Sequence, residues 1–175
     1  FLGCPVEGYE GVRCILTRQA AAALARVREE LRPFGLNIKV YDAFRPQRAV
    51  DHFVRWASDP GDVKMKAAYY PQWEKERLIP DGFIAARSSH SRGSTVDLTL
   101  VDQRGRDLDM GTRFDWFGSE SRADAPGMGM AQRAHRMLLR LLMEKHGFAP
   151  YEAEWWHFTL REEPYPDTYF DFPVR

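Results

Sequence analysis

The apolar residues of this chain follow helical spacing in some stretches and strand-like alternation in others, and this mixture constrains the fold most. Apolar residues recur at helical spacing after Thr17, which can cap the helix, and Pro33 with Gly35 can close it. Thr95–Leu100 instead alternates and is rich in β-branched residues, which is typical of a strand. Such a mixture predicts an α+β fold in which helices flank a small antiparallel sheet.

Further elements are expected along the chain. Asn37–Phe44 indicates a strand, and Pro46 can begin a second helix directly after Arg45. Val63–Trp73 is weakly helical, and Trp155–Leu160 indicates another strand. The Pro- and aromatic-rich tail, residues 164–175, is expected to wrap the surface.

A long helix is expected over Met128–Lys145, ending at Gly147. Its apolar residues are spaced to line one face, and we expect that face to be buried. The residues of this face are Met130, Ala134, Met137, Leu138 and Leu141.

Length and charge limit the classes of function. The 175 residues suit one domain, 1–175, and the 25 basic and 25 acidic side chains cancel. A neutral chain has no global field to attract nucleic acid or an anionic membrane, so a small substrate fits better. No membrane span or secretion signal is recognisable, so a soluble protein of the cytoplasm or periplasm is expected. Cys4 and Cys14 allow one bridge or two free thiols.

Two short polar stretches carry the residues best suited to chemistry, Ser88–Asp97 and Glu154–His157. Catalytic zinc commonly takes three ligands from His, Asp and Glu and leaves a fourth position for water. His90, Asp97 and His157 make such a set. The alternative is that these are isolated structural histidines, the role that we expect for His52, His135 and His146.

Spacing adds a geometric requirement. His90 and Asp97 are seven positions apart and would face opposite sides of one straight strand, so a turn must intervene. Residues 91–93, Ser-Arg-Gly, can supply it. Glu154 and His157 are also an odd number apart, so a helical turn or a bulge must bring them together. We expect Glu154 just before the strand, in irregular backbone.

At these stretches a family resemblance becomes specific. The pattern S-x-H-x-x-G-x-x-x-D, followed later by E-x-W-H, resembles the zinc signature of VanX-type D-Ala-D-Ala dipeptidases. D-Ala-D-Ala carboxypeptidases, related peptidoglycan amidases and hedgehog-type folds share this signature. The resemblance implies that Zn²⁺ is bound by His90, Asp97 and His157, and that Glu154 is the catalytic base.

Two further segments are similar to the dipeptidase branch of this group. Residues 41–50 resemble the segment that carries the catalytic arginine of these dipeptidases, and the resemblance implies that role for Arg45. Residues 109–115 also resemble the dipeptidase branch. From the residues alone, Arg45 could instead be a surface arginine at a helix start. Such dipeptidases also hold the substrate amine with an upstream tyrosine, whose position Tyr9 does not match.

The implied reaction is hydrolysis of a small dipeptide, D-Ala-D-Ala, to two D-alanines. Zinc lowers the pKa of bound water to about 7, Glu154 transfers the proton, and Arg45 meets the charge that develops on the carbonyl oxygen. Asp115 is the candidate for the substrate ammonium and Ser88 for its carboxylate. The alternatives are that Asp115 is a solvated loop residue and that Ser88 is a turn residue. We expect Trp155 or Trp156 to fill the core.

Two competing functions remain open. A D,D- or L,D-carboxypeptidase acting on longer peptidoglycan stems would need an open cleft, whereas a zinc-stabilised binding module would need neither Glu154 nor Arg45. The sequence does not distinguish vancomycin resistance, cell-wall recycling and nutritional use of D-alanine, and it gives no oligomeric state.

Overall fold

The computed structural model describes residues 1–175, and its strands form one antiparallel sheet in the order β1-β2-β4-β3. The strands are β1 (Leu36–Asp42), β2 (Thr95–Asp102), β3 (Phe148–Tyr151) and β4 (Glu154–Leu160). The central strand β2 is buried along nearly its whole length, because helices cover one face of the sheet and the remaining elements face the other. The predicted α+β fold with a small antiparallel sheet is confirmed.

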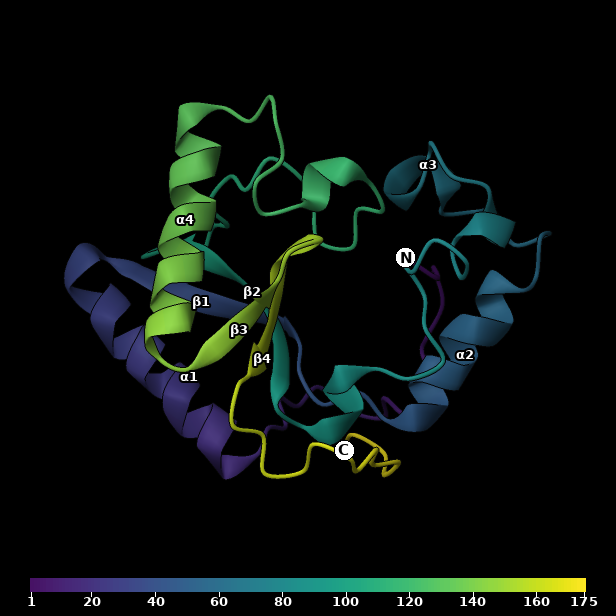
Figure 1. Ribbon diagram of the computed structural model, residues 1–175, viewed down its shortest axis with the longest axis horizontal. Helices are drawn as coiled ribbons and strands as arrows, with labels where there is room; N and C mark the ends of the chain where they lie inside the picture. The colour runs from purple at the N-terminus through teal and green to yellow at the C-terminus, as the bar shows by residue number, and fades with distance from the viewer.

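Two long helices, α1 (Arg18–Leu31) and α4 (Met130–Lys145), pack on the same side of the sheet (Figure 1). The Thr17 hydroxyl caps α1 by accepting from the Ala20 N–H, as its sequence predicts. On the other side lie α2 (Gln47–Ala57) and the single turn α3 (Lys66–Tyr69). Short 3₁₀ turns complete the chain: η1 (Arg32–Phe34), η2 (Lys75–Arg77), η3 (Ser89–Arg92) and η4 (Ser119–Ser121).

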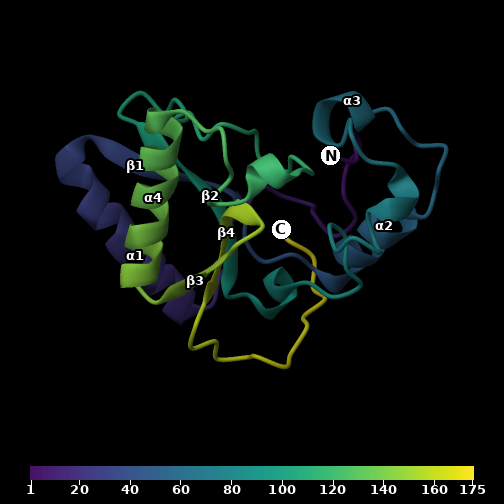
Figure 2. The same cartoon turned by 45° about the horizontal axis from the view of Figure 1, so that its top comes forward.

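Apolar side chains form two separate clusters, one on each side of the sheet. The larger joins α1 and α4 to the sheet and includes Val27, Leu98 and Trp156. The smaller gathers around α2 and includes Phe53 and Phe117. Figure 2 shows the sheet with α1 and α4 on one side and α2 and α3 on the other. One cavity is lined from both sides, so residues of the sheet and of α2 meet there.

The prediction of which face of α4 is buried is wrong. Met130, Met137 and Leu141 are 85%, 59% and 55% exposed, Ala134 is also exposed, and Leu138 lies at the edge of the larger cluster. The buried residues are Arg136, Leu139 and Met143. The Arg136 guanidinium donates to the backbone carbonyls of Met110, Glu120 and Arg122, which allows a charged side chain to occupy the core face.

Other expectations differ in detail. Glu154 is the first residue of β4 rather than part of irregular backbone before it. The short strand β3 gives no sequence signal of its own, and Val63–Trp73 contains only the turn α3. Cys4 and Cys14 are both free and exposed. No helix combines the length and the apolar character that a membrane span requires.

Candidate metal centre and active site

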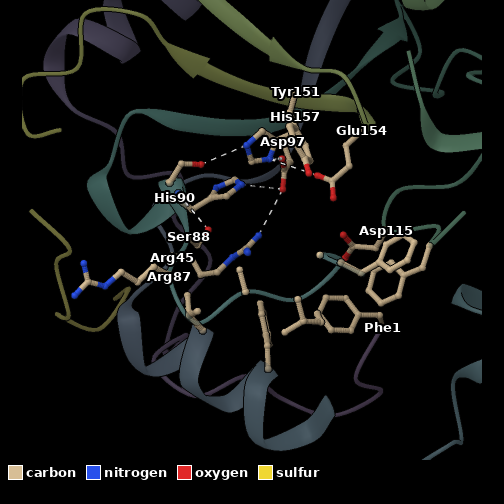
Figure 3. A pocket seen from close by; sticks show the side chains of 18 residues that line it. Phe1, Arg45, Arg87, Ser88, His90, Asp97, Asp115, Tyr151, Glu154 and His157 are labelled. Carbon is tan, nitrogen blue, oxygen red and sulfur yellow. Dashed lines mark hydrogen bonds and ion pairs between the residues drawn. The ribbon is translucent and has the colours of Figure 1, made fainter. Parts of the chain in front are cut away.

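Three predicted ligands come together from three elements. His90 lies in η3, Asp97 on β2 and His157 on β4, where Asp97 and His157 are paired in register. One ligand atom of each lies within 4.8 Å of the others. The Asp97 carboxylate lies between the rings, 3.2 Å from His90 Nε2 and 3.0 Å from His157 Nδ1 (Figure 3).

The turn that the spacing requires is η3, which ends at Gly93. Gly93 has φ +78°, a left-handed conformation that glycine adopts without strain, so the chain reverses between His90 and Asp97. The ring of His90 is oriented by its Nδ1, 2.6 Å from the Ala43 carbonyl oxygen. An Nδ1–H donor to that carbonyl leaves the Nε2 lone pair facing Asp97, an arrangement typical of metal-binding histidines.

Two buried polar atoms at this site lack a hydrogen bond. His90 Nε2 and Asp97 Oδ1 are both shielded from solvent, and neither makes a hydrogen bond, although Asp97 Oδ2 lies 3.2 Å from His90 Nε2 and His157 Nδ1 lies 3.0 Å from Asp97 Oδ1. Unsatisfied buried polar atoms are uncommon because each loses its hydration without compensation. A divalent cation coordinated by these atoms and by His157 would satisfy them, so the donor set fits a metal ion such as zinc.

Glu154 points into the same cavity from the start of β4 (Figure 3). Its Oε2 lies 3.6 Å from His157 Nδ1, and the pairing of β3 with β4 is irregular between Pro150 and Tyr151. A bulge at this point was one of the two expected ways to bring Glu154 and His157 together. Burial raises the pKa of Glu154 to about 7, although His157 opposes the rise.

Arg45 reaches the centre from the loop between β1 and α2, and it is not a surface residue, because its side chain is only 17% exposed. The guanidinium lies 2.8 Å from Asp42 Oδ2 and 3.6 Å from Asp97 Oδ2, and it sits over the Phe53 ring. Burial alone would lower the pKa of Arg45, but the carboxylates of Asp42 and Asp97 outweigh it and raise the pKa.

Sequence reasoning missed three residues at this site. Asp42 holds Arg45 with one carboxylate oxygen, while the other accepts from the Tyr9 hydroxyl at 2.7 Å. The Ser89 hydroxyl lies 3.3 Å from His157 Nε2. Asp42 lies beside a register shift in β1, and only the structure shows that Tyr9 lies next to it. Ser89 could have been suspected, because it directly precedes His90.

Asp115 and Ser88 line the cavity on opposite sides of the Arg45 guanidinium (Figure 3). Asp115 is the only non-glycine residue with positive φ, at 60°, a conformation that aspartate tolerates better than most residues. Burial, together with the negative charge of Asp97, raises the pKa of Asp115 to about 7. The Ser88 hydroxyl accepts from the His90 N–H, so it caps η3 while lining the cavity.

The remaining histidines lie outside the metal centre. His52 accepts from the Glu7 N–H, His135 contacts the Asp109 carbonyl, and His146 contacts Glu30. Trp155 and Trp156 are both buried, at 3% and 2% exposure, so both pack in the core.

Comparison with known proteins places this chain among peptidases. The sequence profile of Peptidase_M15, described as D-ala-D-ala dipeptidase, matches residues 1–175. A D-alanyl-D-alanine dipeptidase of Enterococcus faecalis is 46% identical over 99% of this chain and 87% of that protein. One of Streptomyces coelicolor is 46% identical over the same shares. One of Escherichia coli is 36% identical over 87% of this chain and 69% of that protein.

Solved structures show the same fold at low sequence identity. The vancomycin resistance D,D-pentapeptidase VanY, in complex with Zn(II), has a TM-score of 0.51 and 14% identity, and the match covers 91% of this chain and 80% of that chain. VanYB in complex with D-alanine-D-alanine has a TM-score of 0.50 and 12% identity, and the match covers 89% of this chain and 80% of that chain. On the full-length profile match and the curated relatives, the chain belongs to the Peptidase_M15 family of D-Ala-D-Ala dipeptidases.

Proposed function

We propose that this chain hydrolyses D-Ala-D-Ala to two D-alanines with one Zn²⁺ held by His90, Asp97 and His157. One observation carries the proposal: the three donors, the half-buried carboxylate of Glu154 and the guanidinium of Arg45 line the same cavity of about 270 Å³. The relatives named D-alanyl-D-alanine dipeptidase and the Zn(II) complex of VanY support this choice of substrate and metal.

Glu154 is the proposed proton carrier. When bound, zinc in such a site supplies Lewis acidity and makes water acidic enough to lose a proton near pH 7. Glu154 accepts the proton of the attacking water and donates it to the leaving amine. A carboxylate whose pKa is raised toward neutral by burial suits both steps, because it can both accept a proton and release it near pH 7.

Arg45 is the proposed stabiliser of the tetrahedral oxyanion. Its guanidinium stays charged, and Asp42 fixes its orientation by accepting from Nε and contacting the NH2 nitrogen. A preoriented donor of this kind acts mainly on the transition state, where the negative charge develops.

Asp115 and Ser88 are the proposed contacts for the two charged ends of the dipeptide. A carboxylate at one side of Arg45 can bind the ammonium, and a hydroxyl at the other side can donate to the carboxylate. A cavity of about 270 Å³ suits two alanine-sized residues and favours a dipeptide over a longer peptidoglycan stem.

The decisive experiment measures D-alanine release from D-Ala-D-Ala by the zinc-loaded protein, with and without a chelator. L,L- and L,D-dipeptides and a stem pentapeptide serve as comparison substrates. We expect chelator-sensitive hydrolysis of the D,D-dipeptide and little release from the pentapeptide. Preferred cleavage of the pentapeptide would favour a carboxypeptidase, and bound zinc without any hydrolysis would favour a binding module.

The Glu154→Gln variant tests the proton carrier. It should retain zinc but lose at least about 10² in kcat, because an amide cannot accept the proton. Glu152→Gln is the matched control, since Glu152 lies on the same hairpin and pairs with Arg140 outside the cavity. Unchanged D-alanine release by Glu154→Gln would remove Glu154 from this role.

A further inference from the structure

The C-terminal tail, residues 164–175, contacts both η3 and the start of α2, although it forms neither a helix nor a full strand. Figure 1 shows the yellow tail passing beside η3 and the first turn of α2. The Phe170 N–H donates to the Ser91 carbonyl at 2.9 Å, and the Phe170 carbonyl accepts from the Gln47 N–H at 3.1 Å. One residue of the tail therefore joins the turn that bears His90 to the helix that follows Arg45.

The first turn of α2 needs such a partner because its own cap position is Pro46. A helix leaves its first N–H groups without intrahelical acceptors, and a nearby Ser, Thr, Asp or Asn usually supplies one. Proline has no side-chain acceptor, and no local side chain caps α2. Asp171 supplies the acceptor instead, with its Oδ1 2.8 Å from the Arg48 N–H.

The same aspartate holds the Arg48 side chain. Arg48 Nε lies 2.9 Å from Asp171 Oδ1, and the NH2 nitrogen lies 3.0 Å from Oδ2. Phe172 then stacks on Phe44, the residue before Arg45, with ring centroids 4.3 Å apart. The tail thus fixes the backbone on both sides of Arg45, whose own N–H donates to the His90 carbonyl at 3.4 Å.

We propose that Asp171 is a positioning residue that caps α2 from the tail and thereby holds Arg45 in place over the metal centre. This inference rests on the proposed function, because it assigns the tail a part in the same reaction. A displacement of about 1 Å in a catalytic group can cost on the order of 10² in rate, so a loosened helix start should reduce turnover more than substrate binding.

The test compares Asp171→Ala with Asp171→Asn in the full-length, zinc-loaded enzyme. Asp171→Ala removes the acceptor, and we expect kcat for D-Ala-D-Ala to fall about tenfold with KM within about twofold and zinc content unchanged. Asparagine keeps an oxygen for the Arg48 N–H, so Asp171→Asn should restore kcat to within about threefold of the wild type. In an Arg45→Ala background, Asp171→Ala should cause no further fall in kcat.

Asp102→Ala is the matched control. Asp102 also accepts from backbone N–H groups and pairs with an arginine, Arg106, but outside the cavity. The Asp102→Ala substitution should leave kcat for D-Ala-D-Ala unchanged. Equal kcat values for Asp171→Ala and the wild type, or an equal fall in the Arg45→Ala background, would overturn the positioning role.

Amide hydrogen exchange provides a readout that does not depend on catalysis. Asp171→Ala should accelerate exchange at Gln47 and Arg48, and Asp102→Ala should not. An inactive wild-type enzyme would overturn the proposed function, and the exchange result would still decide the positioning. Faster exchange at these two amides would support it, and unchanged exchange would overturn it.

Discussion

At the scale of single residues, the site is an arrangement of charges that would be costly to bury separately. The Arg45 guanidinium lies between Asp42 and Asp97, and Asp97 in turn lies between His90 and His157. Each charge is balanced by a neighbour, either close in the chain, as for Asp42 and Arg45, or on another segment, as for Arg45 and Asp97, which makes burial tolerable. A substitution at one position therefore acts on its partners as well.

Arg45→Ala should lower kcat by about 10²–10³, the typical cost of losing one oxyanion donor. Arg45→Lys should also be impaired, because one ammonium cannot reproduce the two contacts of Nε and NH2 with Asp42. Steady-state kinetics with D-Ala-D-Ala measures both. Arg55→Ala is the control, since Arg55 is an exposed arginine of α2 paired with Glu7, and a comparable loss in it would contradict the assignment.

Asp115→Asn should raise KM for D-Ala-D-Ala by roughly 10–100-fold, the equivalent of about 1.5–3 kcal/mol for a hydrogen bond to a charged group. Asparagine also tolerates the positive φ at this position, so the backbone should persist. The comparison substrate is N-acetyl-D-Ala-D-Ala, which has no ammonium. If the substitution impaired both substrates equally, Asp115 would not be the ammonium contact.

At the scale of elements, α4 shows that helical spacing identifies a helix more securely than its buried face. Two stripes of α4 are largely apolar, and the buried one includes Arg136. Its guanidinium donates to three backbone carbonyls of the segment between β2 and α4, so this polar group is satisfied inside the protein.

Leu139→Ala and Leu141→Ala compare these two stripes directly. Leu139 is fully buried, so its truncation should lower the free energy of unfolding by about 2–5 kcal/mol, whereas the half-exposed Leu141 should change it by less than about 0.5 kcal/mol. Urea denaturation of both variants measures the difference. The reverse order would favour the face that the sequence pattern indicates.

At the scale of the whole molecule, the site lies where separate parts of the fold meet. The sheet contributes Asp97, Glu154 and His157, η3 contributes His90, and the cavity wall on the other side comes from α2 and the smaller apolar cluster. A metal bound by His90, Asp97 and His157 would join β4 to η3 and β2, which are distant from it in the unfolded chain. Metal binding should therefore stabilise the folded state.

Removal of zinc should lower the Tm of the protein. A ligand at 1,000 times its Kd adds about 4.1 kcal/mol, which for a chain of this size corresponds to roughly 8–16 °C. Thermal unfolding with zinc, with chelator and after zinc is restored measures the shift. His90→Ala should abolish it, whereas His135→Ala should retain it, because His135 lies outside the centre. A shift that survives in His90→Ala would place the metal elsewhere.

Local sequence signals determined much of the fold and indicated the candidate metal ligands. Thr17 before a helical pattern, Gly93 at the turn after His90, and the alternation of β2 act on immediate neighbours, and each signal predicted its element. The spacing of His90 and Asp97 likewise required a turn, and that of Glu154 and His157 required a helical turn or a bulge. The structure contains the turn η3 and an irregular pairing of β3 with β4.

Only the tertiary structure decided which residues surround that centre. The buried face of α4, the strand β3, the support of Arg45 by Asp42 and Tyr9, and the cap of α2 by Asp171 all depend on residues distant in sequence. Asp171 and Arg48 are 123 positions apart, and nothing in the neighbourhood of either indicates the other. Local spacing can specify a turn or a strand, whereas burial and partner choice follow from how all the elements pack together.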